Sequence, residues 1–335
     1  MVLLGKNDSL PYLIYQTTSG TWYSRGKLPN PAGVKFRAIA TGPGNGGSLQ
    51  VLLLGATDSL PYLIYQTTSG NWIWAGHLPA FGSTKFTAIA AGRGNSHQLQ
   101  VIGLGTTDSL AYLIWQDEGG AWHSGGHLSA FRTTKFRTVT SAGDACCDSD
   151  NLLQFILLGA NDSLAYQIYQ ESSGFWGSAA GPITAGWQLI KFSAVAALAN
   201  GPFPSTADVI GLHIGDGAPY VFATEENTVV CWCGPLGGGA HFSAVAAGIG
   251  NSEHTQVIGL GATDGLPYLN WSDGFWYPTT PLPTPNSLPF KTLATGNGNG
   301  GSLQVILLGR DNGLPYVLYQ TTSGNWIWGD LLPDP

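Results

Sequence analysis

Charged side chains are scarce in this chain of 335 residues, where Asp, Glu, Lys and Arg together make up 10%. Ordinary soluble domains hold about 25%. With a formal net charge of −7, the chain lacks the basic face that a nucleic-acid-binding protein needs for phosphate. No apolar run approaches the roughly 18 residues of a membrane-spanning helix, so no membrane insertion is expected.

Cysteine is equally sparse, and its four copies form two clusters, Cys146-Cys147 and Cys231-Trp232-Cys233. Neither cluster has the spacing of a zinc site, and the sequence does not decide between disulfides and free thiols. The apolar stretch Val2–Leu4 is too short for the core of a signal peptide and follows no cationic start. We therefore expect no classical export signal in the chain and release by a non-classical route, with the location otherwise unknown.

Long runs of helix-forming residues are missing as well, and 48 glycines and 20 prolines interrupt any helical pattern. Disorder is disfavoured, because 43% hydrophobic residues can fill a large core. A β-rich protein with short strands and many tight turns is what remains.

One sequence motif is repeated seven times along the chain. A tyrosine, usually in the phrase Leu-Pro-Tyr, recurs at intervals of 50, 50, 54, 54, 48 and 48 residues, and an Asp (Asn in the last copy) precedes it by four positions. The tyrosines are Tyr12, Tyr62, Tyr112, Tyr166, Tyr220, Tyr268 and Tyr316. The repeat predicts a single domain over residues 1–335, built from seven units of about 50 residues.

Each repeat contains four strand-like runs, which we letter a to d. In the second repeat they are Lys85–Ala90, Leu99–Gly105, Tyr112–Gln116 and a run that starts at Ala121, and a turn is predicted at Gly92–Asn95. Four short antiparallel strands per repeat, seven times over, predict an all-β fold: a seven-bladed β-propeller of four-stranded blades. Small residues alternate along strand a, so we place it innermost, and the polar strand d is placed at the outer edge.

Strand a occurs only six times, each copy beginning with a phenylalanine: Phe36, Phe86, Phe136, Phe192, Phe242 and Phe290. Seven full repeats would need roughly 350 residues, so the chain is short by about one strand a with its loop. We therefore expect one incomplete blade, with residues 1 to about 28 supplying its strands b, c and d.

The Asp column invites a catalytic interpretation, but equivalent copies in successive blades cannot converge on one substrate. An Asx turn that fixes the b–c hairpin is the favoured interpretation. The acidic cluster Asp144, Asp148 and Asp150 lacks the spacing of a calcium loop, and the seven histidines keep no ligand spacing. No catalytic or phosphate-binding motif is present, so we predict neither an enzyme nor a cofactor or metal.

Aromatic residues recur in two columns, flanked by neutral amides. Pyranose rings stack on Trp and Tyr, while amides bind sugar hydroxyls, so the columns predict carbohydrate binding; packing between blades is the alternative for each column. Repeated weak sites would act together on a glycan-coated surface and would agglutinate cells. The candidate site residues are Trp22, Trp72, Trp122, Trp176, Trp276, Trp326, Tyr65, Gln66, Trp115, Gln116 and Asn95.

A family resemblance supports this interpretation. The run from Leu99 to Gly105, then Asp108-Ser109-Leu110-x-Tyr112 with Trp115-Gln116, and Gly120-x-Trp122, resembles the blade repeat of the Photorhabdus-type (PLL-like) bacterial lectins. The resemblance covers essentially the whole chain. It implies a seven-bladed propeller with sites between adjacent blades for L-fucose and related, including O-methylated, sugars on host cell surfaces, and it implies a homo-oligomer. The fifth copy, with Thr224, Glu225 and Glu226 and no aligned Trp, departs from the pattern.

Two other function classes remain open. A sialidase-like propeller glycosidase is suggested by Ser272-Asp273-Gly274-Phe275-Trp276, but the arginine cluster that such an enzyme needs is not apparent. A protein-interaction platform has no positive support in the uncharged, glycine-rich surface.

Overall fold

A computed structural model gives the arrangement of the chain. It describes residues 1–44, 48–78, 82–94, 98–144, 153–170, 173–183, 189–199, 207–225, 228–236, 239–251, 254–273, 275–285, 288–298 and 301–333. The fold is an all-β, seven-bladed propeller whose blades are antiparallel sheets, with essentially no helix among these residues beyond the short 3-10 turn Ser129–Phe131. None of the described helices is long and apolar enough to cross a membrane.

The chain divides into two units, of which the first comprises Met1–Tyr15 and Ser24–Gly181 and the second Gln16–Tyr23 and Pro182–Asp334. The single domain over residues 1–335 stays a prediction.

The first four sheets fall in the first unit, apart from the strand residues Gln16, Trp22, Tyr23 and Pro182. The opening sheet has only three strands, β1 Val2–Leu4, β2 Pro11–Gln16 and β3 Trp22–Lys27. The next three have four strands each: β4 Phe36–Pro43, β5 Leu49–Gly55, β6 Pro61–Gln66 and β7 Trp72–His77; β8 Phe86–Arg93, β9 Leu99–Gly105, β10 Ala111–Gln116 and β11 Trp122–His127; β12 Phe136–Asp144, β13 Leu153–Gly159, β14 Ala165–Gln170 and β15 Trp176–Pro182. The predicted incomplete blade is confirmed.

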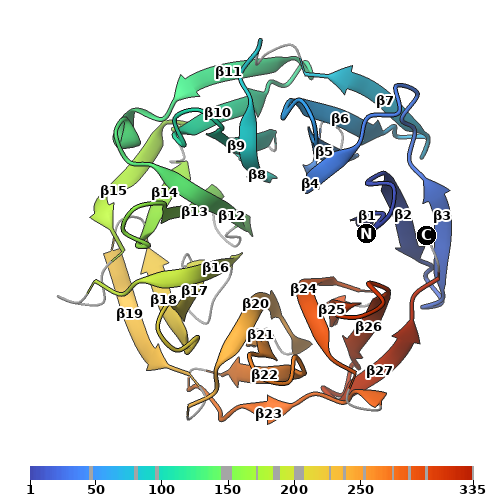
Figure 1. Ribbon diagram of the computed structural model, residues 1–335, viewed down its shortest axis with the longest axis vertical. Helices are drawn as coiled ribbons and strands as arrows, with labels where there is room; N and C mark the ends of the chain where they lie inside the picture. Colours follow the sequence, from blue (N-terminus) through green and yellow to red (C-terminus); the bar gives the residue numbers. More distant parts are fainter. Residues whose placement is uncertain are drawn as a thin grey trace. The chain divides into compact units, whose positions relative to one another are not determined.

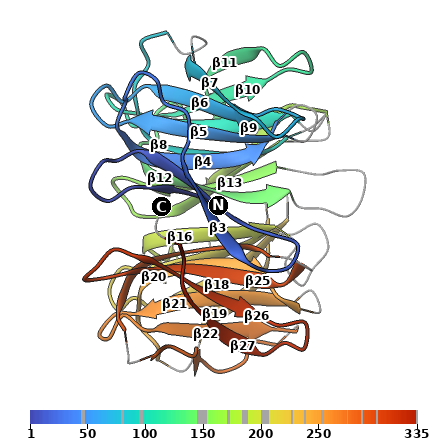
Figure 2. The same cartoon turned by 90° about the vertical axis from the view of Figure 1, so that its right-hand side faces the viewer.

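The second unit holds three four-stranded sheets. They are β16 Phe192–Ala199, β17 Ala207–His213, β18 Pro219–Glu225 and β19 Thr228–Pro235; β20 Phe242–Ile249, β21 Thr255–Gly261, β22 Pro267–Ser272 and β23 Thr280–Pro281; β24 Phe290–Asn297, β25 Leu303–Gly309, β26 Pro315–Gln320 and β27 Trp326–Leu331. The sheets β20–β23 and β24–β27 pack against each other (Figure 1 and Figure 2) through a core that includes Ile258, Leu260, Leu303 and Leu318.

Strand order within the blades follows the prediction. In the first unit the first strands β4, β8 and β12 lie next to one another, and the second, third and fourth strands of each blade follow in order (Figure 1). Strand β9 is buried at every position, whereas the fourth strand β11 has no buried residue. In these blades strand a therefore lies next to strand a of the adjacent blade, and strand d forms the outer edge of its blade.

One predicted turn is wrong in part. Strand β8 continues through Gly92 to Arg93, which pair with Gln100 and Leu99, so the turn predicted at Gly92–Asn95 begins later than expected. A Cβ at Gly92 would lie 2.3 Å from Cδ1 of Leu153 on the next blade. Gly42 and Gly248 meet Leu99 and Leu303 in the same way. These glycines admit a neighbouring leucine and do not terminate a strand.

A backbone hydrogen bond joins successive blades at five of the b–c turns. Ser59 has φ of 62°, and its carbonyl accepts a hydrogen bond of 2.9 Å from the N–H of Phe86, the first residue of the next blade. Ser9 and Ser109 repeat this with Phe36 and Phe136. Left-handed backbone favours glycine, and later blades place Gly217 and Gly265 at this position. The turn residue therefore sets the position of the next strand a.

Candidate functional site

The Asp column fixes the b–c turns. Asp58 Oδ1 accepts a hydrogen bond from the N–H of Leu60 (3.1 Å), and Oδ2 accepts one from the hydroxyl of Tyr62 (2.7 Å). The same two bonds occur at Asp8, Asp108, Asp162 and Asp264, with Tyr12, Tyr112, Tyr166 and Tyr268. The predicted Asx turn is confirmed for these copies; the tyrosine hydroxyl was not foreseen. The carboxylates hold the b–c turns through these bonds.

These pairs make stability depend on pH at both extremes. Burial, and then the hydrogen bond to the Asp partner, raises the pKa of Tyr62, Tyr112 and Tyr166 to about 12. The hydrogen bond from Tyr12 is the main cause that lowers the pKa of Asp8 from 3.8 to about 2; burial opposes it, and the Leu10 N–H and Lys27 add to it.

We expect the free energy of unfolding to fall as pH rises from 10 to 12 and as it falls from about 4 to 2. A tyrosine whose pKa is raised by folding stabilises the protein fully below pH 10, and this contribution is lost through pH 12; the depressed Asp pKa acts in the opposite direction. Each such tyrosine adds a slope of up to ~1.4 kcal/mol per pH unit. Denaturant unfolding at a series of pH values, with Tyr166→Phe beside the parent, measures this. An equal alkaline slope in both proteins would contradict it.

The first of two equivalent cavities lies between sheets β4–β7 and β8–β11. We call it the Trp122 cavity, and its volume is about 550 Å³. Gln50, Tyr65 and Gln66 line it from one blade, and Gln116 and Trp122 line it from the next. These residues lie at the start of the second strand, the end of the third strand and the start of the fourth strand of their blades.

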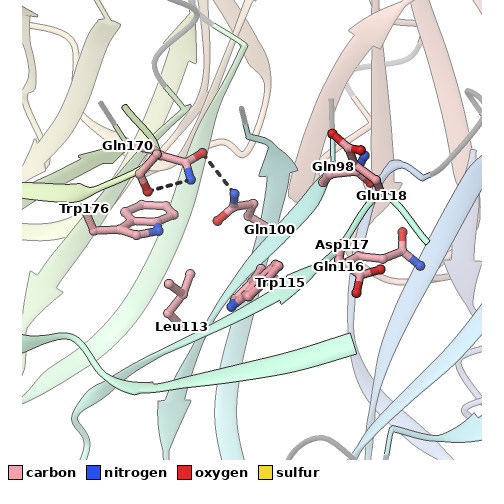
Figure 3. Close-up of a pocket in the computed structure, with 10 residues that line it drawn as sticks. Gln98, Gln100, Leu113, Trp115, Gln116, Asp117, Glu118, Gln170 and Trp176 are labelled. Carbon is pink, nitrogen blue, oxygen red and sulfur yellow. Dashed lines mark hydrogen bonds between the residues drawn. The ribbon is translucent and has the colours of Figure 1, made fainter. Parts of the chain in front are cut away.

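The second cavity repeats the first one blade further on, between β8–β11 and β12–β15. We call it the Trp176 cavity, and its volume is about 440 Å³. Gln100, Trp115 and Gln116 line it from one blade, and Gln170 and Trp176 from the next (Figure 3). Position for position, its glutamines and rings correspond to those of the Trp122 cavity, so one arrangement is built twice from different parts of the chain.

Glutamine pairs bridge the blades at both cavities. In the Trp122 cavity, Gln50 Nε2 donates to Gln116 Oε1 (2.9 Å), and Gln116 Nε2 donates to the carbonyl of Gly120 (3.1 Å). In the Trp176 cavity, Gln100 Nε2 donates to Gln170 Oε1 (3.0 Å), as Figure 3 shows, and Gln170 Nε2 donates to the carbonyl of Gly174 (3.2 Å). These bonds hold each strand-b glutamine in one orientation, with its carboxamide oxygen directed away from the partner.

Besides Nε2 of His77, three buried polar atoms at the cavities have no partner among the described residues. They are Oε1 of Gln50, Oε1 of Gln100 and Nε1 of Trp122, and the two glutamines are only 4% and 6% exposed. A buried polar group without a partner costs about 1–3 kcal/mol. The Trp122 cavity therefore offers one acceptor and one donor to a ligand, beside the ring of Tyr65.

The predicted site residues are distributed unevenly. Tyr65, Gln66 and Trp122 line the first cavity, Trp115 and Trp176 line the second, and Gln116 lines both.

The other four tryptophans line neither cavity. Trp72, Trp326 and Trp276 are half-buried against the hydrophobic clusters between blades. Trp22 is half-buried at the start of β3. Packing therefore has direct support for Trp72, Trp276 and Trp326, and Trp122 and Trp176 pack against hydrophobic clusters in the same way while also lining a cavity.

Several predicted features fall outside the described residues or side chains. Asn95 lies in the undescribed stretch 95–97. The calcium alternative at Asp144, Asp148 and Asp150, the four cysteines and the Thr224–Glu226 segment of the fifth repeat are likewise outside what the structure describes of side chains. Among the residues that it does describe, no three His, Cys, Asp or Glu side chains gather as metal ligands.

The strand-b glutamines are the site residues that the sequence analysis missed. Gln recurs twelve residues before the repeat tyrosine, as Gln50, Gln100, Gln154, Gln256 and Gln304. A polar residue at a fixed place in an otherwise apolar buried strand was the available signal.

Comparison with known proteins places the fold among propellers. No family model matches the chain, and no curated protein matches it either. Among solved structures, the six-bladed propeller lectin of Aleuria aurantia, described with a fucose recognition mode, is 14% identical, covers 90% of this chain and 99% of its own, and has a TM-score of 0.53. Virginiamycin B lyase of Staphylococcus aureus is 10% identical over 100% of this chain and 89% of its own, with a TM-score of 0.52. At these identities the similarity shows the fold alone.

Proposed function

We propose that the chain is a multivalent carbohydrate-binding propeller without catalytic activity, whose sites lie between adjacent blades. The observation that carries the proposal is the repetition of one cavity, in which two aromatic residues accompany a buried glutamine oxygen without a partner. A catalytic centre needs a unique constellation, whereas repeated identical cavities suit weak sites that act together.

The chemistry of the Trp122 cavity fits a neutral sugar. Tyr65 and Trp122 supply apolar faces for the C–H side of a pyranose, and Thr67 and Thr68 line the same cavity with hydroxyls. Gln50 Oε1 accepts and Trp122 Nε1 donates a hydrogen bond, which is the pair that adjacent sugar hydroxyls satisfy. The absence of Lys and Arg among the described lining residues favours an uncharged ligand.

The sugar that we propose is L-fucose or a related, including O-methylated, derivative. The repeat resembles that of the Photorhabdus-type lectins, and one propeller neighbour is a lectin with a described fucose recognition mode. Other propeller neighbours, such as the lyase, are enzymes, so the fold by itself does not select the function.

A glycan array with free L-fucose as competitor tests the proposal. We expect binding to fucosylated glycans that L-fucose abolishes, because the competitor occupies the same cavities. Calorimetry with Trp122→Ala should then show one site fewer per chain, while Trp122→Phe keeps the site at about tenfold lower affinity, since it retains an apolar ring and loses only the indole N–H donor. Absence of binding to every glycan would overturn the proposal, and turnover of a labelled glycoside would favour the glycosidase.

A further inference from the structure

We propose that the Trp176 cavity, which shares the glutamines and aromatic rings of the Trp122 cavity and so also accepts the fucoside, has diverged to bind more tightly a sugar that carries a free amino group. This inference rests on the proposed function and names the ligand class of one site. The inference is argued from the polar atoms that line the two cavities. Those of the Trp176 cavity are mostly hydrogen-bond acceptors, including two carboxylates, whereas those of the Trp122 cavity are uncharged donors and acceptors.

Two carboxylates replace two hydroxyls at the mouth of the Trp176 cavity. Asp117 and Glu118 line it at the c–d turn, where the equivalent lining residues of the Trp122 cavity are Thr67 and Thr68. No Lys or Arg is found among the described lining residues. A carboxylate offers about four acceptor positions, so Asp117 and Glu118 can take donors from a ligand in addition to their protein contacts.

At its buried end, the cavity has an acceptor atom that lacks a hydrogen-bond donor. Gln100 is 6% exposed, its Nε2 is committed to Gln170, and its Oε1 has no partner among the described residues. In Figure 3 Gln100 is drawn near both Trp115 and Trp176, the two tryptophans that line the cavity. A buried acceptor at one end and carboxylates at the other favour a ligand with several donors, of which an ammonium group supplies three.

Trp115 lines the cavity with an aromatic ring, one face of which is covered by His123. The ring of His123 stacks on the indole at a centroid distance of 4.3 Å and an interplanar angle of 22°. His123 Nε2 is hydrogen-bonded to Asp117 Oδ2 at 2.7 Å, and Asp117 Oδ1 accepts from the N–H of Ala121. These bonds lower the pKa of Asp117, so its carboxylate is an anion at neutral pH.

The Trp122 cavity lacks the stacked indole and imidazole rings. Tyr65 stands in place of Trp115, and Ile73, the residue paired with Tyr65 in the sheet, stands in place of His123. An ammonium group near a Trp ring gains a cation–π attraction, in addition to charge-assisted hydrogen bonds to carboxylates. Aromatic rings line both cavities, but the carboxylates that would make charge-assisted bonds line only the Trp176 cavity, since Thr67 and Thr68 stand at these positions in the Trp122 cavity.

Calorimetric titration of the full chain with methyl α-D-glucosaminide, its N-acetyl derivative and methyl α-L-fucoside tests the inference at neutral pH. We expect one site per chain that binds the amino sugar about tenfold more tightly than the N-acetyl sugar. Trp176→Ala should abolish this site. Asp117→Asn with Glu118→Gln should remove the tenfold preference and leave fucoside binding at the Trp122 cavity unchanged.

The Trp122 cavity provides a gain-of-function control. Thr67→Asp with Thr68→Glu should create a second site with a preference for the amine, and Trp122→Ala should remove it again. Ethylamine should bind at least tenfold more weakly than the glucosaminide, because it lacks the ring that stacks on the tryptophans. Equal affinity for ethylamine and the amino sugar would overturn the inference.

The two proposals fail in different ways. If the fucoside binds and the preference for the amine is absent, or survives in the Asp117→Asn, Glu118→Gln variant, then this inference is wrong and the proposed function stands. If no sugar binds to any cavity, then the proposed function itself is wrong.

Discussion

Loss of Trp122 and Trp176 together is expected to weaken binding to a fucosylated surface by about a hundredfold, with the fold intact. Each tryptophan lines one of two equivalent cavities on adjacent blades, so the double variant Trp122→Ala, Trp176→Ala removes two neighbouring sites. Once one site holds a glycan on a surface, its neighbour meets the next glycan at a high effective concentration. Because the double variant loses this simultaneous binding of two adjacent sites, its affinity for the surface falls by about a hundredfold.

Two measurements separate avidity from affinity. Surface plasmon resonance on an immobilised fucosylated glycan reports the hundredfold loss, and calorimetry with the free monosaccharide reports how many sites remain and how tightly each binds. The number of sites should fall by two, while the affinity of the others is unchanged. A uniform drop in the affinity of the remaining sites would show that the tryptophans support the fold, and it would contradict the prediction.

The repeat made the architecture predictable from the sequence. The repeat tyrosine occurs seven times, but the phenylalanine that begins strand a occurs only six times. This difference predicted one blade without an inner strand, and the three-stranded sheet β1–β3 is that blade. Asp before a turn predicted the bond from Asp58 to the N–H of Leu60. Both inferences depend on local chemistry that recurs at fixed spacing, which is why a single sequence was enough.

Contacts between blades were not predictable in the same way. Gln50 and Gln116 are 66 residues apart and meet only because successive sheets pack face to face. Gly92 was interpreted as part of a turn, since glycine often marks one, whereas it faces Leu153 of the next blade. A repeat shows which positions are equivalent, but it does not show which position of one blade touches which position of the next.

The phenylalanine that begins each strand a gives the largest expected effect on stability. Phe136 is 1% exposed, and its ring packs edge-on against Phe131 (5.4 Å between centroids) and Tyr166 (5.4 Å). Its N–H is also the group that bonds the carbonyl of Ser109 in the preceding blade. The residue therefore joins the interior of its own blade to the turn of the neighbour.

Phe136→Ala should lower the free energy of unfolding by about 3–5 kcal/mol, because it leaves a cavity that two rings cannot close. Phe136→Leu is the matched control and should cost less than about 1.5 kcal/mol, since it keeps most of the volume. Chemical denaturation of both variants beside the parent measures the difference. The backbone bond to Ser109 is common to all three proteins, so the difference reports side-chain packing alone. A loss below about 1 kcal/mol for Phe136→Ala would mean that the contacts between blades, and not the phenylalanine cores, carry the stability of the propeller.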